Sequence, residues 1–255
     1  MRWLGLLQVP VALLVAACGG DAFPDYHYRM TIYADDKAFS SVRAIEQREV
    51  SSMVDSAGRR VERKLTGEAV ILDLPGGTYY ALLSKPDNAD YASLIPGAAL
   101  ARHIGGDESR SDAEQAMNEA RDEARRAADP GYFLDDIAAR SRAMTEVEGA
   151  KDLPRTLPPR PGRAPFQAWP MFVTFGDPQD PRTVREVSPD SIGVSRITIE
   201  ITDEDVTTGI ENKFSWWTRF QDRRYDGSSE IVQDMRTLDL RNWLTNGQFS
   251  TEEPE

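Results

Sequence analysis

The chain has one cysteine, Cys18, and two histidines, His27 and His103, among its 255 residues. This scarcity excludes metal sites built from cysteine and histidine, and it excludes disulfide bonds as a source of stability. A Ser/His/Asp site would need one of the two histidines, and no Gly-x-Ser-x-Gly motif accompanies them. We therefore expect no cofactor, no metal and no catalytic residue of these types.

Long hydrophobic runs are also missing after residue 18, where no segment has the roughly 20 apolar residues that cross a bilayer. Basic residues are in deficit, with 30 Lys and Arg against 42 Asp and Glu, so the net charge is −12 at pH 7. Such a chain repels nucleic acid and anionic headgroups, and we expect no nucleic-acid partner.

Residues 1–17 have the parts of a secretory signal peptide. Arg2 gives a positive start, and Trp3–Val15 is a short apolar run. Val15-Ala16-Ala17-Cys18 resembles the bacterial lipobox, which implies a diacylglyceryl group on Cys18, cleavage before it and an acyl chain such as palmitate on the new amino terminus. Several chains are needed because a single one binds a membrane only marginally. The alternative is an ordinary signal peptide with an incidental cysteine.

The residues after Cys18 predict a tether and a location. Gly19 follows the cysteine instead of aspartate, which by analogy with enteric lipoproteins favours the outer membrane over the inner one. Residues 18–25 contain two glycines and a proline and reach at most about 30 Å at ~3.5 Å per residue. We expect a protein anchored in the cell envelope that faces the periplasm.

The fold predicted for residues 26–250 is a single α+β domain, with a largely antiparallel sheet and a few helices on one side or at the periphery. Tyr26–Ala34 and Arg196–Thr202 alternate apolar and polar residues, which is typical of strands with one buried face. Two apolar runs around Pro75-Gly76-Gly77 predict a hairpin. Further strands are expected within 39–54, 61–74 and 171–175.

Helices are predicted from capping boxes and apolar spacing. Ser111 with Glu114, and Thr208 with Glu211, have the Ser/Thr-x-x-Glu pattern that opens helices. Helical segments are expected at 91–103, broken at Pro96-Gly97, and at 111–128, 134–144 and 208–217.

A proline-rich connector is predicted at 152–170, where six prolines occur. Without backbone donors at these positions it is neither a helix nor a central strand. It either separates two domains or runs over the surface of a single one, and we favour the second arrangement. Residues 251–255 are expected to form a disordered tail.

Several segments resemble a family of uncharacterised exported proteobacterial proteins. They begin with Tyr26-x-Tyr28-Arg29 and Gly67-Glu68-Ala69-Val70. Near the other end they include Val173-Thr174-Phe175, Asp180-Pro181, Val184, Val187-x-Pro189, Ile197-Thr198-Ile199-Glu200-Ile201-Thr202-Asp203-Glu204 and Val206-Thr207-Thr208-Gly209-Ile210. The resemblance implies one domain, because it involves both ends of the mature chain. It supplies no active site.

An aromatic cluster is formed in the sequence by Phe214, Trp216, Trp217 and Phe220. It is interpreted either as core or cover over the sheet, or as a protein-binding patch, since aromatic residues are enriched at interface centres.

An acidic group is formed by Glu200, Asp203, Glu204 and Asp205. Paired carboxylates hold cations or serve as general acid and base. The alternative is a solvated strand end ahead of a helix amino terminus, where negative charge is favourable.

The function that these observations favour is a membrane-anchored envelope lipoprotein that is not catalytic and binds another protein. The second hypothesis is a periplasmic hydrolase or cation-binding domain that uses the acidic group, and an enzyme is the less favoured class.

Overall fold

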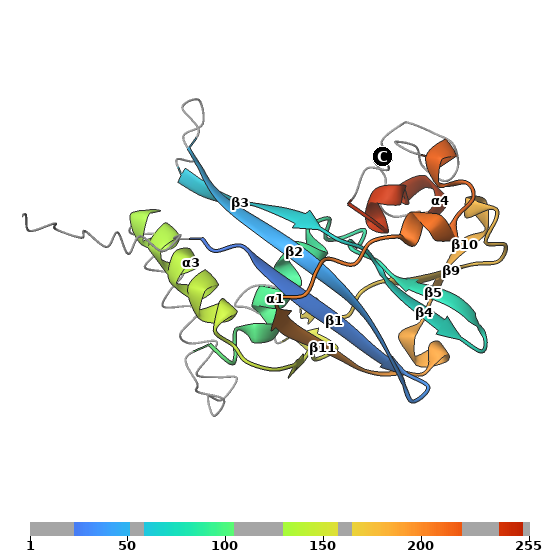
Figure 1. Cartoon of the computed structure of the whole chain (residues 1–255), viewed down its shortest axis with the longest axis horizontal. Coiled ribbons are helices and arrows are strands. Elements are labelled where there is room, and N and C mark those ends of the chain that lie inside the picture. Colours follow the sequence, from blue (N-terminus) through green and yellow to red (C-terminus); the bar gives the residue numbers. More distant parts are fainter. Residues whose placement is uncertain (1–22, 52–58, 105–129, 158–164, 221–239, 252–255) are drawn as a thin grey trace, which may run out of the picture.

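Antiparallel strands dominate the computed structural model of the chain, which describes residues 23–51, 59–104, 130–157, 165–220 and 240–251 (Figure 1). This confirms the prediction of a largely antiparallel architecture. The strands form a five-stranded sheet, a four-stranded sheet and a two-stranded ribbon. Within the described residues, no helix combines the length and the apolar character needed to span a bilayer.

The five-stranded sheet has the strand order β3-β2-β1-β11-β6, and all its neighbours are antiparallel. Its central strand is flanked by β2, which follows it in the chain, and by β11, which comes from the carboxy-terminal part. Met30 of β1 is therefore opposite both Ser41 and Ile199. The strands are β1 (Tyr26–Ala34), β2 (Lys37–Ser51), β3 (Arg59–Thr66), β6 (Lys151–Asp152) and β11 (Val194–Thr202).

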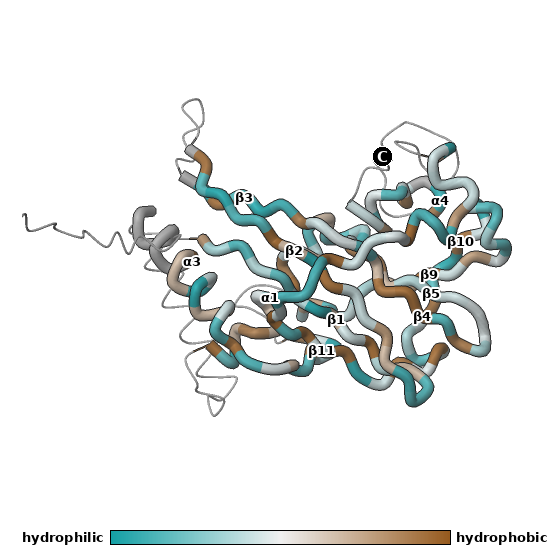
Figure 2. Tube along the Cα trace, viewed as in Figure 1, coloured by the Kyte–Doolittle hydropathy of each residue, from teal (hydrophilic) through white to brown (hydrophobic). Residues whose placement is uncertain are grey.

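The β1 strand alternates between buried and half-buried residues along its whole length, as its sequence predicts. Tyr28, Met30 and Ile32 are fully buried on the inner face, together with Ile199 of β11. Arg29 lies on the opposite, outer face. Figure 2 shows the same alternation of apolar and polar residues along the sheet. Period-two burial places one side of the sheet against the core and leaves the other side polar.

The helix α1 (Tyr91–Leu100) packs into the core of this sheet, but it is not broken where the sequence predicted a break. It continues through Pro96, which cannot donate a hydrogen bond to the carbonyl of Ala92. That carbonyl accepts a bond of 2.7 Å from the Tyr28 hydroxyl instead. A tertiary contact with β1 therefore compensates for the proline. The predicted helix at 134–144 is confirmed as α3 (Pro130–Thr145).

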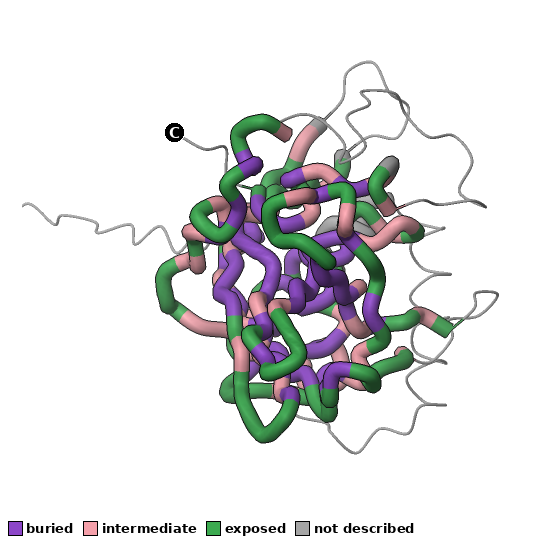
Figure 3. Tube along the Cα trace, turned by 90° about the vertical axis from the view of Figure 1, so that its right-hand side faces the viewer, coloured by how far each residue is buried: buried purple, intermediate pink, exposed green. Residues whose placement is uncertain are grey.

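The four-stranded sheet has the order β10-β9-β5-β4. The hairpin predicted around Pro75-Gly76-Gly77 is confirmed, because β4 and β5 pair in antiparallel register across it. Figure 3 shows buried residues filling the interior. The strands are β4 (Val70–Leu74), β5 (Gly77–Ala81), β9 (Phe172–Phe175) and β10 (Val184–Val187), and the short helix α4 (Leu240–Trp243) contacts β10.

The two sheets are joined where β3 passes into β4, at Gly67-Glu68. The Glu68 carbonyl accepts hydrogen bonds from Ser41 Oγ (2.8 Å) and Arg43 Nε (2.9 Å), both on β2. Arg43 is fully buried, and its Nη1 lies 3.3 Å from the Tyr28 hydroxyl. Gly67 has φ +140°, and a Cβ at this position would lie 2.9 Å from Arg43 Cγ. Gly67 is therefore the point of passage between the sheets, and it has no room for a side chain.

The described parts of the proline-rich segment pack on the body and pair as short strands, a pairing that the sequence did not predict. Leu153 and Ala168 are buried. The strands β7 (Thr156–Leu157) and β8 (Phe166–Gln167) pair with each other, while β6 pairs with β11. Each of these strands is only two residues long, because a proline without a donor follows closely or precedes it.

Three other expectations concern chain boundaries and helices. The expected helix at 208–217 is replaced by 3-10 turns at Ile210–Lys213 and Trp217–Phe220. Gly209, with φ +109°, precedes the first turn, and no side chain caps it. Thr251 belongs to the fold instead of the tail, since its amide donates to the Gly67 carbonyl at 3.1 Å. The predicted helix at 111–128 and residues 252–255 lie outside the described residues.

We predict that Gly67→Ala lowers the free energy of unfolding by about 3 kcal/mol, through backbone strain and displacement of Arg43. Urea unfolding followed by tryptophan fluorescence measures the change. Gly97→Ala in α1 is the matched control, because a Cβ there meets nothing within 4 Å. The control should gain about 0.5–1 kcal/mol from helix propensity. Equal effects of the two substitutions would contradict this account of the junction.

Candidate functional site

The aromatic cluster predicted from the sequence is core, and its interpretation as a protein-binding patch is wrong. Phe214, Trp216 and Trp217 are each at most 4% exposed, and Phe220 is half-buried beside them. The Phe214 ring centroid lies 4.6 Å from that of Trp216 and 5.8 Å from that of Trp217. Further rings come from Tyr80 of β5, Phe175 of β9 and Phe249 of the carboxy-terminal segment. The cluster therefore packs against the second sheet.

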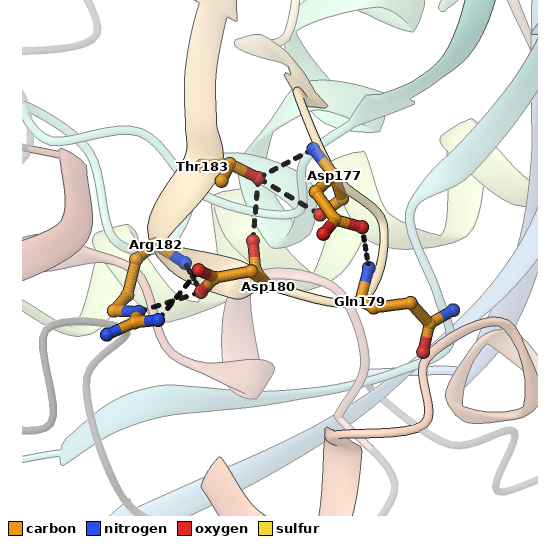
Figure 4. A network of polar contacts seen from close by, with 5 residues as sticks. All are labelled: Asp177, Gln179, Asp180, Arg182 and Thr183. Atoms are coloured by element: carbon orange, nitrogen blue, oxygen red, sulfur yellow. Dashed lines mark hydrogen bonds and ion pairs between the residues drawn. The ribbon is translucent and has the colours of Figure 1, made fainter.

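A polar loop between β9 and β10, whose internal contacts are shown in Figure 4, lies beside this cluster. Thr183 Oγ1 bonds with the Asp177 and Asp180 carbonyls, and Arg182 donates two bonds to the Asp180 carboxylate. The Trp216 indole N–H donates to the Pro178 carbonyl at 2.9 Å, which fixes the loop on the ring. The hydrogen bonds from Arg182 lower the pKa of Asp180. These groups bond to one another across a tight turn, which is a structural arrangement.

The acidic group lies where the chain leaves β11 and crosses the outer face of the sheet. Arg29 of β1 pairs with Glu200 at 2.9 Å and also with Glu204. The pKa of Arg29 is raised, chiefly by its hydrogen bond with Glu204. Asp203 and Asp205 are exposed. The structure therefore brings Glu200 and Glu204, two of the four predicted residues, together around the Arg29 guanidinium. This group occupies the position that a bound metal cation would need.

The segment that carries these acids crosses β1 and bonds to the part of β2 that extends beyond β3. His27 Nδ1 lies 2.6 Å from the Glu204 carbonyl. The Thr207 amide donates to the Val42 carbonyl, and the Val42 amide donates to Thr207 Oγ1. Within the described part of the chain, no three His, Cys, Asp or Glu side chains are placed to hold a metal ion. Glu200 and Glu204 therefore hold the crossing segment against the sheet through Arg29.

An arginine lies over a half-buried tyrosine on the outer face of the sheet, at the end where β11 begins. The Arg196 guanidinium is 5.2 Å from the centroid of the Tyr33 ring. Asp152 of β6 pairs with Arg196 at 2.5 Å. Both charged side chains remain at least half exposed. A cation over an aromatic face is a favourable contact, and here a carboxylate fixes its orientation.

A second arginine–aromatic pair is formed by Arg155, three residues after Asp152, and Trp169. Arg155 is 5.3 Å from the centroid of Trp169, which is half-buried. Its guanidinium donates two bonds to the Asp190 carboxylate, at 2.7 and 2.9 Å. The hydrogen bond from Arg155 lowers the pKa of Asp190. We refer to the two pairs together as the arginine edge: Arg196 with Tyr33 and Asp152, and Arg155 with Trp169 and Asp190.

The arginine edge has the composition of a recognition surface. Partly exposed tyrosine, tryptophan and arginine are the residues that dominate binding energies at protein interfaces. Their orientation is fixed by aspartates before any partner arrives, which reduces the entropy lost on binding. Sequence reasoning missed the edge because its residues come from four separate segments. The available signal was the pair Arg155 and Trp169 inside the proline-rich stretch.

The chain is held firmly where it leaves the predicted tether. Phe23 is 4% exposed and packs with Ala138 of α3. The Gln47 amide donates to Asp25 Oδ1 at 2.7 Å, and the Gln47 side chain donates to the Pro24 carbonyl at 2.9 Å. The predicted tether at 18–25 is therefore shorter, because its last three residues belong to the folded body. The lipidation residue Cys18 lies outside the described residues.

The comparisons with known proteins give no relative from which to transfer a function. No family model matches the chain, and neither a curated protein nor a solved structure matches it. The resemblance to exported proteobacterial proteins therefore stays a prediction. Functional inference rests on the geometry of the described residues.

We predict that Phe214→Ala lowers the free energy of unfolding by about 3–5 kcal/mol, as expected for an aromatic residue removed from a packed core. Ser215→Ala is the matched control at the exposed neighbouring position, and it should change stability by at most about 0.5 kcal/mol. Urea unfolding of both variants tests the assignment. A stable Phe214→Ala protein would mean that the cluster is not the core of the second sheet.

We predict that Arg155→Gln raises the pKa of Asp190, because the neutral amide no longer stabilises the carboxylate. In the unaltered protein, the lowered pKa contributes stability above the ordinary aspartate pKa, and this contribution is lost as the pH falls through the lower, folded-state value. Titration of the Asp190 carboxyl carbon by NMR measures the shift. Arg182→Gln serves as the control, since it should move the pKa of Asp180 and leave that of Asp190 unchanged.

Proposed function

We propose that the protein is a lipid-anchored α+β domain of the bacterial cell envelope, which binds another protein and catalyses no reaction itself. The anchor is Cys18, and the resemblance to exported proteobacterial proteins supports the same setting. Gly19 favours the outer membrane, with the body facing the periplasm. The arginine edge is the observation that carries the binding proposal.

The surface chemistry supports recognition through polar and aromatic contacts. Among the described residues, Leu94 is the one large hydrophobic residue that is exposed, at 45%. A partner that docked through a broad apolar patch would find none on this part of the protein. The arginine edge offers instead two oriented guanidinium groups beside half-buried rings, and it suits a partner with acidic and aromatic side chains.

The alternative, a hydrolase or a cation-binding domain, receives less support from the geometry. General acid and base catalysis by two carboxylates requires that they face a common substrate. Glu200 and Glu204 both face Arg29 instead. An arginine between two carboxylates stabilises their charged forms and opposes the binding of a second cation.

We predict that Tyr33→Ala combined with Arg196→Ala lowers the yield of a cross-linked envelope partner at least about tenfold, the loss expected when a central interface pair is truncated. The lipidated protein is cross-linked in intact cells, solubilised and analysed by mass spectrometry. The same spectra reveal whether Cys18 carries acyl groups.

The control variant combines Asp73→Ala and Lys213→Ala, an exposed ion pair away from both the arginine edge and β3. This variant should capture the partner as well as the unaltered protein does. An equal loss in both variants would contradict a role for the arginine edge. An acylated protein that yields no specific partner would refute the binding function and leave the anchor standing.

A further inference from the structure

The point at which the tether meets the body is fixed by packing and by hydrogen bonds. Phe23 is buried among Val61 of β3 and residues of α3. Gln47 of β2 bonds to both residues that follow Phe23, and Ser141 Oγ of α3 donates to Gln47 Oε1 at 3.3 Å. The chain therefore leaves the folded body at one defined place, between the outer part of the β2–β3 hairpin and α3.

The length of chain between this place and the lipid is short. Five residue steps separate Cys18 from Phe23, and at ~3.5 Å per residue they span at most about 18 Å. A fixed exit and a short tether restrict how the body can turn. The end that contains Val61 must remain close to the bilayer surface.

The strand at this end is basic, although the protein is acidic. β3 carries four basic residues and one acidic residue, Glu62, whereas the whole chain has a net charge of −12. The basic residues are Arg59, Arg60, Arg63 and Lys64. Arg60 pairs with Glu62 at 2.6 Å, and Lys64 lies 3.5 Å from Glu46 of β2. The side chains of Arg60, Glu62 and Lys64 are more than half exposed, whereas that of Glu46 is half-buried. β3 is an edge strand, so this charge lies along the margin of the sheet.

We propose that the β3 edge rests against anionic phospholipid headgroups and so orients the anchored protein on its membrane. The inference depends on the lipid anchor of the proposed function and adds the surface that the anchor presents to the bilayer. Basic side chains near an anionic leaflet are attracted to it. The repulsion from the acidic remainder of the chain is weak there, because charges more than about 8 Å away are screened at physiological salt.

This orientation places the arginine edge away from the bilayer. Tyr26, which follows the docked segment, and Tyr33 are seven residues apart on β1, which corresponds to about 23 Å at ~3.3 Å per residue. In Figure 1, β1 runs from the side where α3 and the start of the described chain lie to the opposite end of the sheet. A membrane-distal arginine edge is accessible to a partner across the periplasmic space.

Fluorescence energy transfer to an acceptor on lipid headgroups tests the orientation. With Cys18 acylated, an introduced cysteine is the only free thiol, so a donor dye is attached at Glu62→Cys or, at the far end, at Arg182→Cys. The lipidated protein is reconstituted in vesicles of phosphatidylcholine alone or mixed with phosphatidylglycerol. We expect several-fold more efficient transfer from position 62 than from position 182, and a further increase at position 62 when phosphatidylglycerol is present.

Charge reversal separates the contribution of β3 from that of the tether. The variant with Arg60→Glu, Arg63→Glu and Lys64→Glu should lose the increase caused by phosphatidylglycerol. Its matched control, with Arg182→Glu, Arg185→Glu and Arg219→Glu, should retain it. Equal transfer from the two dye positions, or equal loss in the two charge variants, would overturn the orientation while the anchor stands. Protein that carries no acyl group and does not float with the vesicles would instead refute the anchor and, with it, this inference.

Discussion

The carbonyl group of Glu68 holds the two sheets of this protein in their relative positions. It accepts hydrogen bonds from Ser41 and Arg43 of β2, while the next amide, that of Ala69, donates to Phe249 beside the second sheet. Burying the Arg43 charge costs several kcal/mol in desolvation, and its bonds to the Glu68 carbonyl and the Tyr28 hydroxyl offset part of this cost. Gly67 is required beside it because any side chain would enter the space of Arg43. Both sheets therefore depend on one short passage of chain.

The distribution of aromatic residues decides which rings are buried in the core and which are available at the surface. The largest group of rings packs against the second sheet beside the β9–β10 loop and contributes stability. Phe220 is half-buried at its margin. The proposed recognition rests on Tyr33 and Trp169, which are half-buried under arginines that aspartates hold in place. Because residues 23–25 dock at the opposite end of β1, the proposed membrane attachment and the proposed partner site lie at separate ends of the same sheet.

Much of the fold followed from local patterns. The alternation in Tyr26–Ala34 and the turn at Pro75-Gly76-Gly77 predicted strands and a hairpin that the structure confirms, because period-two burial and turn chemistry are properties of short segments. The helix break at Pro96 failed as a prediction. There the missing backbone donor is replaced by the hydroxyl of Tyr28, more than 60 residues earlier in the chain. The short strands in the proline-rich segment were not predicted either, since they are stabilised by partners that local sequence does not reveal.

The sequence by itself determined the alternating strands β1 and β11, the hairpin at Pro75-Gly76-Gly77 and the α3 helix, and its lipobox predicts the anchor, because each depends on residue type and near-neighbour spacing. Only the tertiary structure decided that Phe214 and its neighbours are core, and that Glu200 and Glu204 enclose Arg29. It alone assembled the arginine edge and fixed where Phe23 leaves the body. These features depend on which distant segments pack together, and that choice is made by burial and hydrogen bonding across the whole chain.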